Sequence, residues 1–162
     1  MTLRLDLPDA DATEALGHAL ADTLPLHAVI YLVGDLGAGK TTLARALLRQ
    51  LGVIGAVRSP TYTLIERYPT PVGEVAHIDL YRIADPEELL YLGLDDLAAS
   101  VRLWLVEWPE RGRGALPPAD LRVQLAVREP GRSVELVPGS ERGHLWINAL
   151  SKPPFNPRPG PE

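Results

Sequence analysis

Four residues at fixed spacing form a phosphate-binding pattern. Gly34, Gly39, Lys40 and Thr41 match the motif Gly-x-x-x-x-Gly-Lys-Ser/Thr of a P-loop. Glycines let the backbone curl so that its N–H groups point at phosphate, and the next helix adds its N-terminal dipole. The lysine reaches the β- and γ-phosphates, and the threonine hydroxyl ligates Mg²⁺. The alternative, a glycine-rich turn that merely joins two elements, is disfavoured because a hydrophobic strand is expected before the loop and a helix after it.

The whole loop is expected to hold the phosphates. Its residues are Gly34, Asp35, Leu36, Gly37, Ala38, Gly39, Lys40, Thr41 and Thr42. An Asn-Lys-x-Asp stretch that reads guanine is absent from the sequence, which favours ATP over GTP. A long arginine-rich lid is absent too, so a nucleotide kinase with a closing lid is less favoured. The predicted cofactors are ATP and Mg²⁺.

A P-loop needs a second acidic residue near the metal, at the end of a neighbouring strand. Two residues fit: Glu107 follows the apolar run at 103–106, and Asp79 ends a weaker strand. The residues alone favour Glu107 as the acidic residue near the metal. For Asp79, a role in the site and a position on the surface are about equally expected. His77 could be a base, although a structural histidine is the commoner outcome at a strand end. For Trp108, contact with ligand and simple packing are equally plausible.

The elements that must position these residues alternate between strand and helix. Strands are expected at 3–7, 28–33 and 101–106, and helices at 10–23, at 41–51 and from Asp85-Pro86 onward. Two hairpins are expected, one joining 62–68 to 74–80 and one joining 121–127 to 133–137. This order predicts an α/β fold. Residues 1–150 are expected to form a single domain, and the proline-rich residues 151–162 a disordered tail.

Composition narrows the function classes. The chain has 162 residues, no cysteine and a formal net charge of −5. Disulfides and thiol chemistry are therefore excluded, and a clamp that grips nucleic acid through phosphates is disfavoured. The longest apolar runs fall well short of the roughly 20 residues that span a bilayer. A cytoplasmic protein without membrane contact is the expectation.

Five segments together resemble one family. They are residues 34–42 (GDLGAGKTT), 59–64 (SPTYTL), 77–82 (HIDLYR), 85–89 (DPEEL) and 105–110 (LVEWPE). In this order they are similar to the TsaE (YjeE) family, and the likeness extends from Leu5 to Val137. The family is the ATPase component of the bacterial machinery that makes threonylcarbamoyladenosine at position 37 of ANN-decoding tRNAs. The resemblance implies a P-loop NTPase-like three-layer fold with a mixed parallel and antiparallel sheet flanked by helices.

The resemblance also implies roles for individual residues. Thr41 and Glu107 would hold Mg²⁺, while Lys40 and the loop amides would bind phosphates. Thr61 would face the γ-phosphate, and Asp79 would orient or deprotonate the attacking water. The nucleotide would also contact Asp9, Thr13, Trp108 and Arg132.

The family ATPase acts on a TsaB–TsaD assembly, so tRNA would be met only indirectly. Hydrolysis would reset that assembly between turnovers, and the isolated protein would be a weak ATPase that its partner stimulates. Arg82 is a candidate arginine finger. Two rivals remain open: a small P-loop kinase, and a module that binds ATP without hydrolysing it.

Overall fold

One mixed sheet organises the molecule. The computed structural model describes residues 1–57, 60, 64–153, 155 and 158–160, and in that part of the chain the strands form a single sheet of eight in the order β3-β4-β5-β2-β6-β7-β1-β8. The strands are β1 (Leu3–Leu7), β2 (Ala28–Val33), β3 (Ile65–Tyr68), β4 (Glu74–Asp79), β5 (Val101–Glu107), β6 (Leu121–Arg128), β7 (Gly131–Pro138) and β8 (Arg158–Pro159). The helices are α1 (Ala10–Asp22), α2 (Lys40–Gln50), α3 (Leu94–Ser100) and α4 (Glu141–Leu150), with 3₁₀ segments η1 (Pro86–Leu92) and η2 (Pro109–Gly112).

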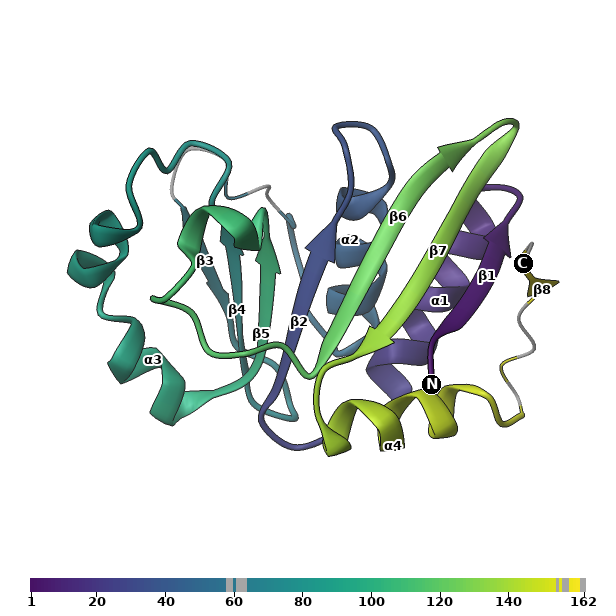
Figure 1. Ribbon diagram of the computed structural model, residues 1–162. Helices are drawn as coiled ribbons and strands as arrows, with labels where there is room; N and C mark the ends of the chain where they lie inside the picture. Colours follow the sequence, from purple (N-terminus) through teal and green to yellow (C-terminus); the bar gives the residue numbers. More distant parts are fainter. Residues whose placement is uncertain (58–59, 61–63, 154, 156–157, 161–162) are drawn as a thin grey trace.

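The centre of the sheet is parallel and its sides are antiparallel. β2 lies between β5 and β6 and is parallel to both, and β4 is parallel to β5. The pairs β3–β4 and β6–β7 are antiparallel, which confirms both predicted hairpins. Because parallel strands end at the same edge of a sheet, the loops after β2, β4 and β5 meet there, along the upper edge in Figure 1.

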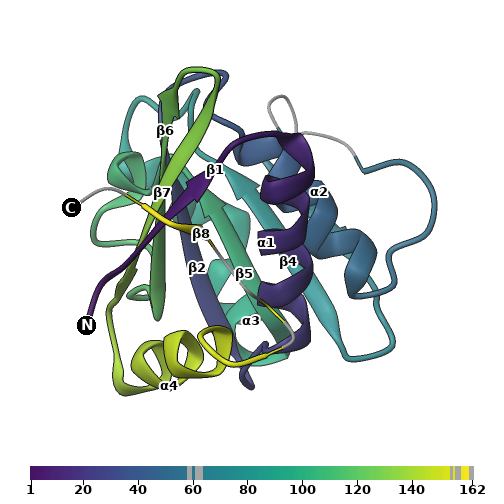
Figure 2. The same ribbon diagram turned by 90° about the vertical axis from the view of Figure 1, so that its right-hand side faces the viewer.

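Helices α1 and α2 cover one face of the sheet, as Figure 2 shows. Leu16 and Leu20 of α1 and Leu43 and Leu47 of α2 are buried in the same core cluster as the inward residues of the central strands. The two helices approach closely at Gly17, where a Cβ would lie 2.8 Å from the Ala46 Cβ. This packing fixes the N-terminus of α2 relative to β2.

The other face is covered over its β4–β5 half. Leu89 of η1 and Leu97 of α3 pack in a second cluster with Ile78, Trp104 and Val106. The predicted helix start at Asp85 is the start of η1, where the Asp85 side chain accepts a hydrogen bond from Glu87 N at 2.9 Å. The segment is a 3₁₀ helix that ends at Gly93, in the left-handed region at φ 68°.

Two α-helices lie outside the sequence prediction. Helix α3 follows Gly93, and α4 follows Ser140, whose side chain accepts a hydrogen bond from Gly143 N. Trp146 of α4 is buried and donates to Thr23 Oγ1 at 3.0 Å. In the part of the chain that is described, no helix combines the length and apolar character that crossing a membrane requires.

The C-terminal tail contains one short paired segment. β8 is antiparallel to β1, and Phe155 packs against the core. Residues 154, 156–157 and 161–162 lie outside the described part of the chain, so the disorder expected for the tail stays a prediction.

Candidate nucleotide site

The glycine loop connects β2 directly to α2, as its mechanism requires. Gly37 and Gly39 have φ values of 81° and 108°, which residues with a side chain rarely adopt. A Cβ on Gly34 would lie 2.6 Å from the Leu125 carbonyl oxygen, so the start of the loop is pressed against β6. Lys40 is the first residue of α2, and its helix N-terminus therefore opens into the loop.

A pocket of about 560 Å³ lies beside the loop. It is bounded by the loop and α2 on one side, by the ends of β4 and β5 on another, and by the start of α1 and β7 on a third. The lining residues are Asp9, Ala10, Thr13, Leu36, Gly37, Gly39, Lys40, Thr41, Thr42, Asp79, Tyr81, Glu107, Trp108, Pro130, Gly131 and Arg132. Segments distant in sequence thus form one concave site, of the volume that a nucleotide-sized ligand needs.

The Lys40 ammonium group is buried within the loop. Its Nζ donates to the Gly34 carbonyl oxygen at 2.6 Å and lies 4.0 Å from the centre of the Trp108 ring. Burial lowers the pKa of Lys40, while the carboxylates of Glu107 and Asp79 oppose that shift. Phosphate oxygens would supply further acceptors to this desolvated cation.

Two carboxylates lie at the ends of adjacent strands. Asp79 and Glu107 are register partners in the parallel pair β4–β5, and they are only 6% and 4% exposed. Burial raises the pKa of Asp79, with a smaller contribution in the same direction from the Glu107 charge. A hydrogen bond from Tyr81 N to Asp79 Oδ1, at 3.0 Å, acts against this rise. A buried carboxyl with an elevated pKa that lines a pocket is suited to accepting a proton.

Glu107 also has a buried partner on β4. His77 Nε2 lies 2.7 Å from Glu107 Oε2, and both side chains are almost completely buried. The other ring nitrogen, His77 Nδ1, is buried without a hydrogen-bond partner among the described residues. From the sequence, His77 could be a base, although a structural histidine was the commoner outcome. In the structure it contacts Glu107 and does not line the pocket.

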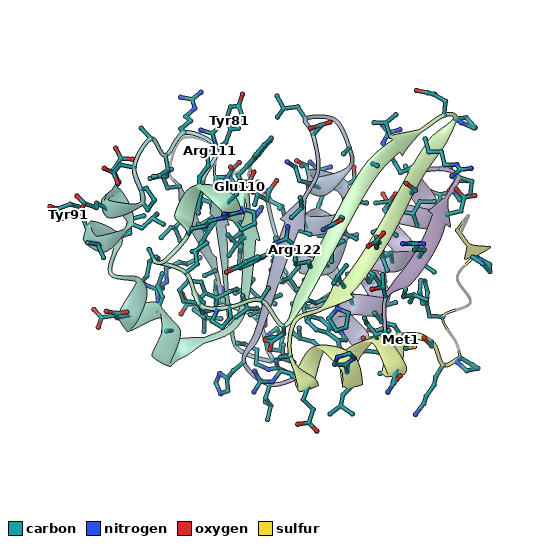
Figure 3. All side chains as sticks on the ribbon, in the orientation of Figure 1. Met1, Tyr81, Tyr91, Glu110, Arg111 and Arg122 are labelled. Atoms are coloured by element: carbon teal, nitrogen blue, oxygen red, sulfur yellow. The ribbon has the colours of Figure 1, made fainter. Side chains whose placement is uncertain are left out.

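Trp108 forms an aromatic wall of the pocket. It adopts a left-handed backbone conformation at φ 56°, uncommon for a bulky residue, at the turn from β5 into η2. Its ring lies 5.1 Å from that of Tyr81, and the Arg111 guanidinium lies 5.3 Å from the Tyr81 ring. Tyr81 and Arg111 extend together at the upper edge of the sheet in Figure 3.

The opposite wall comes from the start of α1 and the start of β7. The Asp9 side chain caps α1 by accepting from Ala12 N at 2.9 Å, and Thr13 is buried one turn further along. At the start of β7, Arg132 Nη2 donates to the Gly37 carbonyl oxygen at 3.1 Å. This bond joins the β6–β7 hairpin to the glycine loop.

The oxygen donors of the pocket suit a hard cation. The Thr41 hydroxyl and the Glu107 carboxylate both belong to its lining. Mg²⁺ takes oxygen ligands, and in phosphate-transfer sites it is commonly held by one or two protein groups together with substrate phosphates. The residues therefore fit a magnesium-bound nucleotide.

Comparison with known proteins shows the family of the chain. A model of the family described as threonylcarbamoyl adenosine biosynthesis protein TsaE matches residues 7–134. The chain belongs to the TsaE family. The tRNA threonylcarbamoyladenosine biosynthesis protein TsaE of Haemophilus influenzae is 42% identical over 150 residues, which cover 90% of this chain and 95% of the relative. TsaE of Aquifex aeolicus is 38% identical over 128 residues, 78% of this chain and 88% of the relative.

A solved structure confirms the fold class. The crystal structure of Bacillus subtilis YdiB is similar to this TsaE family member with a TM-score of 0.72 and 28% sequence identity, over 93% of each chain. The family resemblance predicted from five short segments is therefore confirmed, as is the mixed α/β sheet flanked by helices.

Most of the predicted site residues of this TsaE family member line the large pocket. Gly34 and Asp35 instead line a neighbouring cavity of about 140 Å³, on the side of Lys40 that faces Glu110. Ala38 is buried inside the loop. Arg82 is exposed and is not part of the pocket lining. Thr61 lies outside the residues that the structure describes.

The sequence did not single out Tyr81 or Pro130, which also line the pocket. Tyr81 lies two residues after Asp79, and its ring contact with Trp108 depends on the pairing of β4 with β5. The motif at 77–82 was a signal that this segment matters, but it did not say which side chain faces the ligand. Pro130 belongs to the turn before Arg132. The sequence predicted this turn but gave no sign that Pro130 would line a pocket.

Proposed function

We propose that this chain is a Mg²⁺-dependent ATPase required for the threonylcarbamoyladenosine modification of tRNA at adenosine 37, where it acts on a TsaB–TsaD assembly. One observation supports this proposal above others: a P-loop lysine and threonine share a single pocket with two buried strand-end carboxylates. Family membership supports the biological role.

The glycine loop and its flanking residues would bind the nucleotide. Backbone amides of the loop and the N-terminus of α2 would receive the phosphates, and Lys40 would contact the β- and γ-phosphates. Thr41 and Glu107 would hold Mg²⁺, which neutralises phosphate charge and orients the nucleotide when it is bound. Trp108, Asp9, Thr13 and Arg132 border the remaining volume, where the nucleoside would lie.

Hydrolysis needs a positioned water and charge stabilisation. Water attacks the γ-phosphorus, the bond from that phosphorus to the bridging oxygen breaks, and ADP and inorganic phosphate are released. Asp79 would orient this water and take its proton, a role that its raised pKa favours. Lys40 and the loop amides would offset the charge that develops on the transferred group.

The isolated chain is expected to be a slow ATPase. Of the arginines that the structure describes, Arg132 lines the pocket, and its guanidinium is bonded to the Gly37 and Gly131 carbonyl oxygens. An arginine finger from another protein accelerates related reactions by about 10³–10⁵-fold. Stimulation by the TsaB–TsaD assembly would follow if that assembly supplies such a group.

Asp79→Asn tests the hydrolytic role. Phosphate release in the presence of the assembly should fall by at least about 100-fold, since general base catalysis typically contributes 10²–10⁴-fold. The affinity for ADP with Mg²⁺, measured by calorimetry, should remain within threefold of the wild type, about 0.65 kcal/mol. Full turnover by this variant would contradict the proposal, and a phosphorylated acceptor in place of free phosphate would identify a kinase instead.

A further inference from the structure

We propose that His77 is a positioning residue for the metal site, because it donates a hydrogen bond from Nε2 to Oε2 of Glu107 and thereby fixes that carboxylate. The inference rests on the proposed function, in which Glu107 holds Mg²⁺. It assigns a role to a side chain that is absent from the lining of the nucleotide pocket.

The strand pairing places the two residues on one side of the sheet. In the parallel pair β4–β5, Asp79 is the register partner of Glu107, and His77 is the partner of Leu105. Since successive side chains of a strand alternate between faces, His77 and Asp79 lie on the same face, with His77 further from the strand end. The imidazole therefore approaches Glu107 from inside the protein, at 2.7 Å.

The environment of the ring determines which nitrogen carries the hydrogen. An ionised carboxylate can only accept hydrogen bonds, so the nitrogen that faces Glu107 must be the donor. His77 Nδ1 is buried and has no partner in the described part of the chain, so a hydrogen placed there would be a buried unpaired donor. The geometry thus places a hydrogen on His77 Nε2, which donates it to Glu107 Oε2.

This bond uses one of the lone pairs of the Glu107 carboxylate. The remaining lone pairs would be available to Mg²⁺. A glutamate side chain has several rotatable bonds, and a hydrogen bond to one oxygen restricts them before the ligand arrives. Groups that orient metal ligands from behind typically change metal affinity or activity by 10–100-fold when they are removed.

Two variants of His77 separate positioning from packing. His77→Gln places an amide N–H donor at a distance along the side chain similar to that of Nε2, and His77→Met has a similar length without a donor. The measurement is the affinity for ADP by titration calorimetry, once with MgCl₂ and once with EDTA. The gain in affinity caused by Mg²⁺ is the quantity to compare, because a role in stability alone would not change it.

The wild type and His77→Gln should show the same gain from Mg²⁺, whereas His77→Met should lose about tenfold or more of it. All three proteins should bind ADP equally in EDTA. An undiminished gain in His77→Met would overturn the inference while leaving the proposed metal site intact. No gain in the wild type, together with no effect of Glu107→Gln, would instead overturn the proposed metal site, and the inference with it.

A spectrum of the wild type provides a readout that does not depend on the folding of any variant. In a long-range ¹H–¹⁵N correlation spectrum, the His77 ring should show a hydrogen on Nε2. The chain has four histidines, and His77→Gln identifies the relevant signals by their loss. The Nδ1–H tautomer at His77 would contradict the assigned hydrogen bond.

Discussion

Asp79, the proposed base, is a side chain whose burial also affects folding. Its pKa is raised above the ordinary value of 3.8 chiefly by burial. A group whose pKa is higher in the folded state stabilises the fold when it is protonated, at low pH. That contribution is lost as the pH rises through the folded-state pKa, and above it the buried charge opposes folding.

Asp79→Asn should therefore raise the melting temperature of the ligand-free protein at pH 7 to 8. The gain should shrink as the pH is lowered toward the folded-state pKa, because a growing fraction of the wild-type carboxyl is then protonated. Differential scanning fluorimetry across this pH range measures it, with Asp95→Asn on the exposed surface of α3 as the control. A lower melting temperature for Asp79→Asn at pH 8 would show that attraction to Lys40 outweighs the cost of burial.

Trp108 should report on nucleotide binding. The Lys40 ammonium lies 4.0 Å from its ring centre while it donates to Gly34, and phosphate binding would draw Lys40 toward the ligand. The intrinsic fluorescence should therefore change when ADP and Mg²⁺ are added. The other two tryptophans, Trp104 and Trp146, are buried in the core and provide a constant background.

Trp108→Phe is the control for that signal. This variant should bind ADP, as calorimetry would show, without the change in fluorescence. A change of the same size in Trp108→Phe would mean that nucleotide binding rearranges the core around Trp104 or Trp146 instead.

Among the elements, local sequence features predicted the strand and the helix that flank the glycine loop. The apolar run that ends at Gly34 and the helix that follows Gly39 are β2 and α2, and the turn signals located both hairpins. The residues that needed tertiary pairing could not be predicted in this way. His77 and Glu107 are 30 positions apart, and only the alignment of β4 with β5 brings Nε2 within reach of the carboxylate.

Helix α4 was missed although its signals are visible in the sequence. Ser140 is a capping residue, Glu141 is acidic in the first turn, and the apolar residues Trp146, Ile147 and Leu150 recur at helical spacing. These signals lie beyond the segments that resemble the family, where no family motif drew attention to them. Their packing partners, such as Thr23, are more than a hundred residues earlier in the chain.

Asp120 links the start of α4 to the sheet by hydrogen bonds. Its removal should destabilise the fold without changing the affinity for the nucleotide. It is buried and accepts from Val29 N at 2.9 Å and from Ser140 Oγ at 2.7 Å. Asp120→Ala would leave these donors unsatisfied and should cost about 2–4 kcal/mol in urea unfolding. Ser140→Ala, which removes the cap, should cost about 1 kcal/mol.

The affinity of folded Asp120→Ala for ADP should equal that of the wild type at low temperature. Asp120 precedes β6, at the end of the sheet where α4 packs, while the pocket lies at the opposite ends of the parallel strands (Figure 1). A tenfold loss of ADP affinity would indicate that the two ends of the sheet are coupled.

For the whole molecule, the net charge indicates whether the chain can bind tRNA directly. A chain with a formal charge of −5 lacks the excess of cations that phosphate backbones attract. The isolated protein should therefore leave tRNA unshifted in a native gel at low salt, while a TsaB–TsaD assembly with the same tRNA serves as the comparison. Salt-sensitive binding of tRNA by this chain alone would contradict the expectation that it meets tRNA only through its partner. It would indicate a local basic surface on this chain.

Phosphate release from ATP with Mg²⁺ distinguishes an ATPase from a protein that only binds the nucleotide. The comparison is between the wild type and Lys40→Ala, each alone and with a TsaB–TsaD assembly. Wild-type release should be slow alone and should rise with the assembly, while Lys40→Ala should release little phosphate in either case, because the charge on the transferred group is no longer offset. Two results would contradict the proposed ATPase activity: equal phosphate release from both proteins, or no release from the wild type under any condition despite tight binding of ATP. The remaining interpretation would then be a docking module that binds the nucleotide without hydrolysing it.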